Sequence, residues 1–150
     1  MTAPPLDPTG ADRRLRLVYS AVPDEATAAR LGLGAVERRL AACANWWPIA
    51  SAYWWKGQLE RPDERALWFK TSPKKLGALF RYLEREHPYE VPDILEVQVS
   101  RAHEPYIAWM LGTIDPDSIE GGGKEVRRSG SPKGRAARSR PRTPARRRLP

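Results

Sequence analysis

Two segments with helical spacing of apolar residues are separated by strand-like segments, and this order constrains the fold more than any other feature of the chain. Residues 23–42 predict a first helix, with Asp24 as its cap and an apolar stripe at Ala29, Leu33, Val36 and Leu40. Residues 71–87 predict a second, with Ser72 as cap and Pro73 at the first helical position. Both helices therefore have one face to bury against another layer.

The segments around these helices have the pattern of strands. Residues 14–22 and 93–100 alternate apolar and polar side chains, which is the period of a half-buried strand. Between the helices, residues 43–55 and 64–71 are rich in aromatic and apolar residues. Lys56 and Gly57 are typical of a tight turn between them, so the two segments predict a hairpin.

These elements give the order β-α-β-β-α-β, and residues 104–112 predict a short last helix that ends at Gly112. Two helices that each cross between strands of one sheet, with a hairpin between the halves, form the ferredoxin-like arrangement. The predicted fold class is α+β: a ferredoxin-like βαββαβ sandwich with a C-terminal helix.

The charge of the chain divides it into parts. The formal net charge is +8, from 26 basic and 18 acidic residues, but residues 121–150 hold eleven Lys or Arg and one Glu. The remainder then has 15 basic and 17 acidic residues, a net charge of −2. We predict a flexible lead-in at 1–13, one domain at 14–118, and a disordered basic tail at 119–150.

Cysteine content and hydropathy indicate the compartment. A single cysteine, Cys43, forms no internal disulfide, and no segment approaches the roughly 20 apolar residues of a membrane span. The N-terminal segment lacks the apolar core of a signal peptide. We therefore expect a cytoplasmic protein. No nucleophile–base pair, phosphate loop or metal motif is apparent, so we do not expect an enzyme.

Four tryptophans lie in two adjacent pairs, at 46–47 and 54–55. Neighbouring residues on a strand point to opposite faces, so the pairs place aromatic side chains on both sides of the sheet. The last helix or another subunit can cover the second face, because large apolar patches seldom remain exposed. The alternatives are a core with a few surface aromatics, or a stacking platform for nucleic-acid bases.

Five short motifs, in this order and spacing, resemble the CutA divalent-cation tolerance family: "VPDEATA", "ERRLAACAN", "SAYWWKGQLE", "FKTS" and "HPYEVPDI". The resemblance runs from about residue 15 to 113. It implies a ferredoxin-like fold related to PII-type signalling proteins and a homotrimer held by long hairpin strands. We expect Tyr53, Trp54 and Trp55 at the trimer interface. The resemblance also implies a role in tolerance of copper and other divalent cations.

The segment "HPYEVP" permits two interpretations of His87. The family resemblance makes His87 a metal ligand, and carboxylates at Glu86, Glu90 and Asp93 can assist it in binding Cu²⁺ or another divalent cation weakly. However, the negative end of a helix dipole favours protonated imidazole, which cannot bind a metal. The alternative is a rigid corner, since prolines follow His87 and Val91.

Other candidate sites are weaker in pattern. Lys70 and Thr71 end a strand and precede a helix, where anions can bind, so they form a candidate ligand cleft. The basic tail can attract nucleic acid or an acidic surface without base specificity.

The first functional hypothesis is a cytoplasmic, homotrimeric, CutA-like protein of copper and divalent-cation tolerance that binds the metal weakly. The alternative is a PII-like trimeric signalling or scaffold module that binds a small ligand or a protein partner without metal.

Overall fold

A computed structural model of the protein describes residues 14–119. The predicted lead-in at 1–13 lies outside the described residues, as does the predicted tail apart from residue 119. No helix within residues 14–119 is long and apolar enough to cross a membrane.

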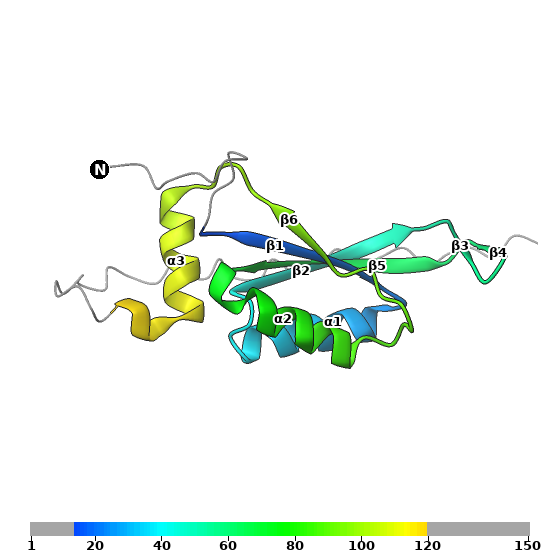
Figure 1. The fold of residues 1–150 in the computed structure, drawn as a ribbon, viewed down its shortest axis with the longest axis horizontal. Helices are drawn as coiled ribbons and strands as arrows, with labels where there is room; N and C mark the ends of the chain where they lie inside the picture. Colours follow the sequence, from blue (N-terminus) through cyan, green and yellow to red (C-terminus); the bar gives the residue numbers. More distant parts are fainter. Residues whose placement is uncertain (1–13, 120–150) are drawn as a thin grey trace, which may run out of the picture.

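The centre of the fold is a four-stranded antiparallel sheet in the order β2-β5-β1-β6. Its strands are β1 (Arg16–Val22), β2 (Cys43–Ala50), β5 (Asp63–Thr71) and β6 (Leu95–Gln98). Helices α1 (Glu25–Glu37) and α2 (Pro73–Glu86) lie side by side against one face, and α3 (Glu104–Ile114) packs at one end of the sheet (Figure 1). A short 3₁₀ helix, Pro116–Ile119, follows α3. This arrangement is the predicted ferredoxin-like α+β fold.

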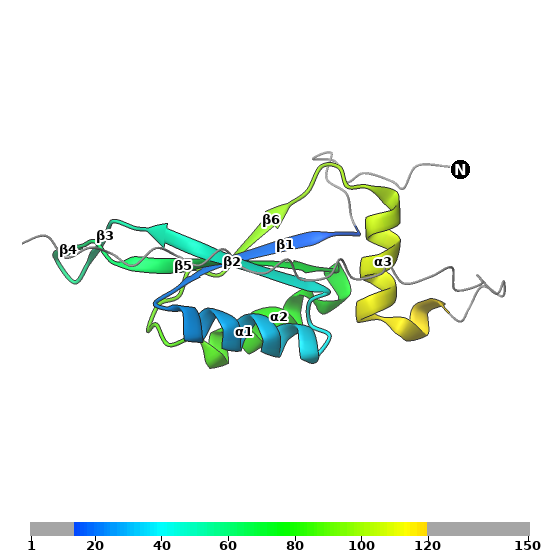
Figure 2. The ribbon, with the colours of Figure 1, turned by 180° about the vertical axis from the view of Figure 1, so that it is seen from behind.

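The hairpin between the helices is interrupted, whereas the sequence predicted continuous strands. Strand β2 ends at Ala50, and a separate two-stranded ribbon follows, made of β3 (Tyr53–Trp55) and β4 (Gln58–Glu60). Lys56 and Gly57 have φ of 48° and 76°, the positive values that a two-residue hairpin turn of type I′ requires. The predicted tight turn is confirmed, and the ribbon extends beyond the main sheet (Figures 1 and 2).

Helix α1 begins as predicted but buries a different face. The Asp24 carboxylate accepts a hydrogen bond from the Thr27 N–H at 2.8 Å. The predicted stripe is wrong at Leu33, which is 55% exposed, whereas Leu40 does pack against the core. The buried residues of α1 are Ala28, Leu31, Gly32, Gly34 and Ala35. A Cβ at Gly32 would lie 2.7 Å from the Trp46 ring, so close packing of helix on sheet selects the glycine face.

Helices α2 and α3 complete the packing. Leu79, Tyr82 and Leu83 of α2 are buried, and Pro73 is the first helical residue, as predicted. Helix α3 continues past Gly112 to Ile114, because its last turn is packed: Met110 and Ile114 form a second small core with Leu15 and Ala42. The predicted end at Gly112 is therefore wrong.

The two faces of the sheet differ in cover. On the helix side, alternate residues of β1 and β5, including Val18, Leu67 and Phe69, are fully buried in the main core. On the other side, the Trp68 ring stacks on Trp47 at 6.5 Å, and no described helix lies over this face (Figures 1 and 2). Trp46 packs on the core and Trp47 points away from it, as strand geometry predicted.

Candidate functional site

A buried corner follows α2 and fixes one side of the candidate site. His87 caps α2 in an extended conformation, and its N–H donates to the Leu83 carbonyl at 2.9 Å. Pro88 then prevents the helix from continuing. The His87 side chain is buried, so its ring nitrogens must find partners inside the protein.

Both ring nitrogens of His87 have such partners. Nδ1 accepts the Tyr89 N–H at 3.1 Å, so the ring proton is on Nε2. Nε2 donates to the Ala21 carbonyl at 3.0 Å, with the Ser20 hydroxyl at 3.1 Å. A metal ion needs a free nitrogen lone pair, and this arrangement leaves none. The geometry thus favours the rigid-corner interpretation of His87.

Electrostatics agree with a neutral His87. Burial lowers its pKa, which outweighs the opposing hydrogen bond to Ala21. The negative charges of Asp93 and Glu64 also oppose the shift without reversing it. The ring is therefore neutral near pH 7, which keeps Nδ1 able to accept its hydrogen bond.

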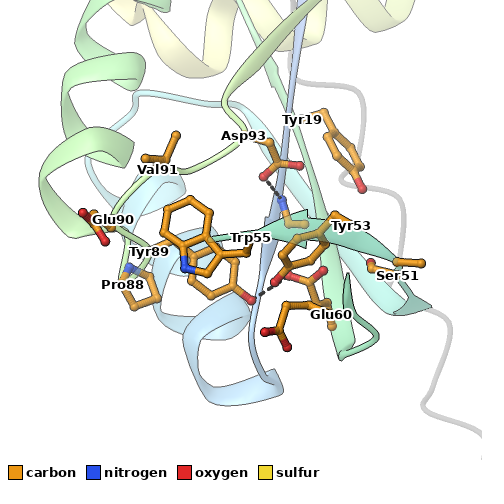
Figure 3. A pocket seen from close by; sticks show the side chains of 13 residues that line it. Tyr19, Ser51, Tyr53, Trp55, Glu60, Pro88, Tyr89, Glu90, Val91 and Asp93 are labelled. Carbon is orange, nitrogen blue, oxygen red and sulfur yellow. Dashed lines mark hydrogen bonds between the residues drawn. The ribbon is translucent and has the colours of Figure 1, made fainter. Parts of the chain in front are cut away.

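Beside this corner lies a pocket of about 610 Å³ (Figure 3). Its lining residues Tyr19 and Ala21 alternate along β1 with the core residues Val18 and Val22, so the pocket lies on the face that α1 and α2 leave uncovered. Residues from β1, the β3–β4 ribbon, β5 and the 88–93 connection contribute to it. Two kinds of side chain dominate its lining: the aromatic residues Tyr19, Tyr53, Trp55 and Tyr89, and the acidic residues Glu60, Glu64, Glu90 and Asp93.

Two of the carboxylates are fixed in position by hydrogen bonds. Glu64 is 3% exposed and accepts the Tyr89 hydroxyl at 2.6 Å. Asp93 accepts the Ala21 N–H at 2.8 Å, which joins the 88–93 connection to β1 (Figure 3). Desolvation of its carboxyl raises the pKa of Asp93, and the Glu64 charge raises it further.

The pKa values of two tyrosines in the pocket are raised by burial and by the same carboxylates. Burial raises the pKa of Tyr19, and the charges of Asp93 and Glu64 raise it further. Burial and the hydrogen bond to Glu64 raise the pKa of Tyr89 strongly. Burial is the largest cause of both shifts, and the further rise from the Asp93 and Glu64 charges indicates a negative potential in the pocket.

The structure separates the four predicted metal residues. Glu90 and Asp93 line the pocket, whereas Glu86 forms an ion pair with Arg30 of α1 at 3.2 Å and does not line it. His87 lies behind the pocket with its nitrogens engaged. Among residues 14–119, no three His, Cys, Asp or Glu side chains are grouped so that they could hold a metal ion.

The predicted ligand cleft lies elsewhere. Lys70 and Thr71 are at the end of β5 remote from Glu64, and neither lines the pocket. The Thr71 hydroxyl is buried and donates to the Leu40 carbonyl at 2.7 Å, while the Lys70 ammonium donates to the Asn45 side-chain carbonyl. Both side chains are thus engaged within the domain.

The three aromatic residues predicted for the trimer interface divide between two surfaces. Tyr53 and Trp55 line the pocket, and Trp54, between them on β3, is 72% exposed. This is the alternation of a strand. The ribbon therefore contributes to the pocket with one face and presents a tryptophan on the other.

Three residues that line the pocket, Tyr19, Glu64 and Tyr89, were not among the site residues predicted from the sequence. One signal was available for Glu64: it is an acidic residue on the same strand face as Ala66 and Trp68. An acidic residue next to apolar residues on one strand face is costly to bury and calls for an explanation.

The fold and pocket together define a small ferredoxin-like α+β protein with a pocket lined by acidic and aromatic side chains. Comparison with known proteins narrows this class. The CutA1 divalent ion tolerance protein family matches residues 16–113. The chain belongs to this CutA divalent-cation tolerance family.

Individual relatives support the assignment over nearly the whole domain. The divalent-cation tolerance protein CutA of Thermotoga maritima is 40% identical over 98 residues, 65% of this chain and 97% of the relative. A CutA homolog of Xenopus laevis is 39% identical over 104 residues, 69% of this chain and 68% of the relative. The structure of CutA from Synechococcus elongatus matches with a TM-score of 0.67 and 35% identity, covering 69% of this chain and 93% of that one.

Proposed function

We propose that this protein contributes to tolerance of divalent metal cations, including copper, by weak binding in the cytoplasm and not by catalysis. One observation carries the proposal: four carboxylates line one pocket, and none of the described residues that line it is Lys, Arg or His. In the part of the chain that the structure describes, no three of these carboxylates are grouped closely enough to hold an ion together, which fits weak binding. Carboxylate oxygens are ligands for divalent cations. Membership of the divalent-cation tolerance family is consistent with this chemistry.

The binding set differs from the one expected from sequence. Asp93 and Glu90 stay in the proposal, and Glu64 joins them as the most deeply buried carboxylate of the pocket. Without an available imidazole, the site lacks the ligand type that Cu²⁺ prefers. This is the physical reason for proposing weak affinity.

We also propose that the protein acts as a homotrimer. The support is the face of the sheet opposite α1 and α2, where Trp47, Leu95 and Val97 are 37%, 52% and 36% exposed. Apolar area of this kind gains free energy when another copy covers it.

The second candidate is a PII-like module that binds a small ligand or a protein partner without metal. The specific observation in its favour is the engagement of both His87 nitrogens, which removes the only imidazole near the pocket from coordination. In this case the pocket would still bind a ligand, but one recognised by charge and shape.

Native mass spectrometry of the full chain with stepwise Cu²⁺ tests the proposal, because it counts subunits and bound metal together. We expect a trimer with one weakly held Cu²⁺ per chain, and weaker uptake after Asp93→Asn. Glu86→Gln is the matched control, since Glu86 pairs with Arg30 outside the pocket and its loss should leave uptake unchanged. A trimer that takes up no Cu²⁺ specifically would favour the metal-free alternative. A monomer would contradict the proposed homotrimer.

A further inference from the structure

The Glu64 carboxylate is the most unusual group in the pocket. Glu64 is 3% exposed, and its described hydrogen-bond partner is the neutral Tyr89 hydroxyl. None of the ion pairs formed within residues 14–119 includes it. A buried carboxylate without a counter-charge is costly, and a second carboxylate, Asp93, lies close enough to raise the cost. A cation that enters the pocket would remove this penalty.

The rest of the lining shows which kind of cation fits. Four aromatic side chains line the pocket together with the carboxylates, among them Trp55 and Tyr53 of the ribbon (Figure 3). The faces of aromatic rings attract ammonium and guanidinium groups and cover their apolar carbons. At about 610 Å³ the pocket also has the size of a small-molecule site, far larger than a metal ion needs.

The chain itself already places one amine at the rim. The Lys56 ammonium lies 5.3 Å from the centre of the Trp55 ring and 3.3 Å from a carboxylate oxygen of Glu90. Lys56 and Glu90 are both largely exposed, so this pairing is weak and can be displaced. The pair places an ammonium group against one ring and one carboxylate of this pocket, the two kinds of contact that an external amine would make there.

We propose that the pocket binds a small organic cation with at least one ammonium or guanidinium group. Glu64 and Asp93 supply the counter-charge for the group that enters, and the rings of Tyr53, Trp55 and Tyr89 contact its carbon chain. This inference rests on the proposed function only in treating the pocket as a ligand site, since its ligand class is different.

A pair of probes of equal length tests the role of charge. Isothermal titration of the full chain at low salt with 1,4-diaminobutane, a diammonium ion at pH 7, should give saturable binding. The neutral analogue 1,4-butanediol should give none. Equal binding of the diol and the diamine, or no saturable binding of the diamine, would overturn the proposal.

Variants place the binding in the pocket. Glu64→Gln keeps the shape and removes the charge, and should weaken diamine binding at least tenfold. Glu84→Gln is the matched control, because Glu84 is exposed on α2 outside the pocket. Trp55→Leu should weaken binding several-fold by removing one ring. Thermal melts of each variant show that it is folded. Equal diamine affinity in Glu64→Gln and Glu84→Gln would contradict the assignment.

The same titrations separate this inference from metal binding. If Cu²⁺ binds in an Asp93-dependent way and the diamine does not bind, the organic-cation inference fails and the proposed metal function stands. If the diamine binds in a Glu64-dependent way and Cu²⁺ does not bind specifically, the inference holds and the metal proposal fails.

Discussion

The two faces of the central sheet are built from the same strands but differ in how far their side chains are buried. On the helix side, Val18 and Phe69 are fully buried within the chain. On the other side, Tyr19 and Trp68 pack edge to face, yet their neighbours Leu95 and Trp47 remain partly exposed. One face is completed by the chain's own helices, whereas the other combines an apolar surface with an acidic pocket and is suited to binding.

The largest effect on stability should come from removing a buried side chain on the face that the helices cover. Phe69→Ala removes a fully buried ring and should lower the free energy of unfolding by about 3 to 5 kcal/mol. Urea unfolding at fixed protein concentration measures this. A loss below about 1 kcal/mol would mean that the helix side is not the rigid core that distinguishes the two faces.

The next largest effect on stability should come from a substitution between the two helices, where they approach one another closely. A Cβ at Gly34 would lie 2.2 Å from the Tyr82 hydroxyl oxygen, so Gly34→Ala should destabilise by about 1 to 3 kcal/mol through overpacking. Gly77→Ala on the exposed face of α2 is the control, since its Cβ would meet only the Arg81 guanidinium at 3.4 Å. It should stabilise by up to about 1 kcal/mol, through helix propensity. Equal effects of the two variants would refute the packing explanation.

A smaller effect in free energy should change the assembly through the open face. Trp47→Glu places a charge beside Trp68 and should weaken the proposed self-association at least tenfold, about 1.4 kcal/mol. Light scattering over a dilution series gives the oligomeric state. Leu33→Glu is the matched control, because Leu33 is an exposed apolar residue on α1 and its change should not affect assembly. Unaltered assembly in Trp47→Glu would rule this face out as the interface.

The smallest effect concerns the corner that joins α2 to the pocket. Burial lowers the pKa of His87 below its ordinary value of 6.5, so the folded protein binds fewer protons there than the unfolded chain. The stabilisation is fully present above about pH 6.5 and is lost as the pH falls toward the folded pKa, at no more than about 1.4 kcal/mol per pH unit.

Urea unfolding at pH 7.5 and 5.5 tests this linkage. His87→Gln should show a smaller loss of stability on acidification than the unmodified chain, and His103→Gln should behave like the unmodified chain. Asp93, whose pKa is raised, acts in the opposite sense at more acidic pH, which is why the comparison ends at pH 5.5. An identical loss in all three proteins would show that His87 does not titrate in this range.

The sequence by itself determined the order of elements, the Lys56–Gly57 turn, the cap at Asp24, the position of Pro73 at the start of α2, and the placement of Trp46 and Trp47 on opposite faces. These features depend on local backbone preferences and on the two-residue period of a strand, which a single sequence contains. The family resemblance also came from short motifs in order.

Only the tertiary structure decided which face of α1 is buried and where the pocket lies. Apolar periodicity favoured Leu33, but contact with Trp46 and Tyr82 required the small residues Gly32 and Gly34 on the buried side. Such close approach is a property of two packed elements, and neither sequence segment shows it alone.

The candidate site also depends on the packing of elements that are distant in the sequence. Tyr19, Glu64 and Asp93 come from three segments widely separated in the chain. The register of β1 with β5 sets Tyr19 opposite Trp68, and Glu64 lies further along the same face of β5. His87 was found from sequence, but its role depends on hydrogen bonds to Ser20 and Ala21 on another strand. Local sequence gave the chemical types present, and the packing of distant segments decided which of them share a pocket.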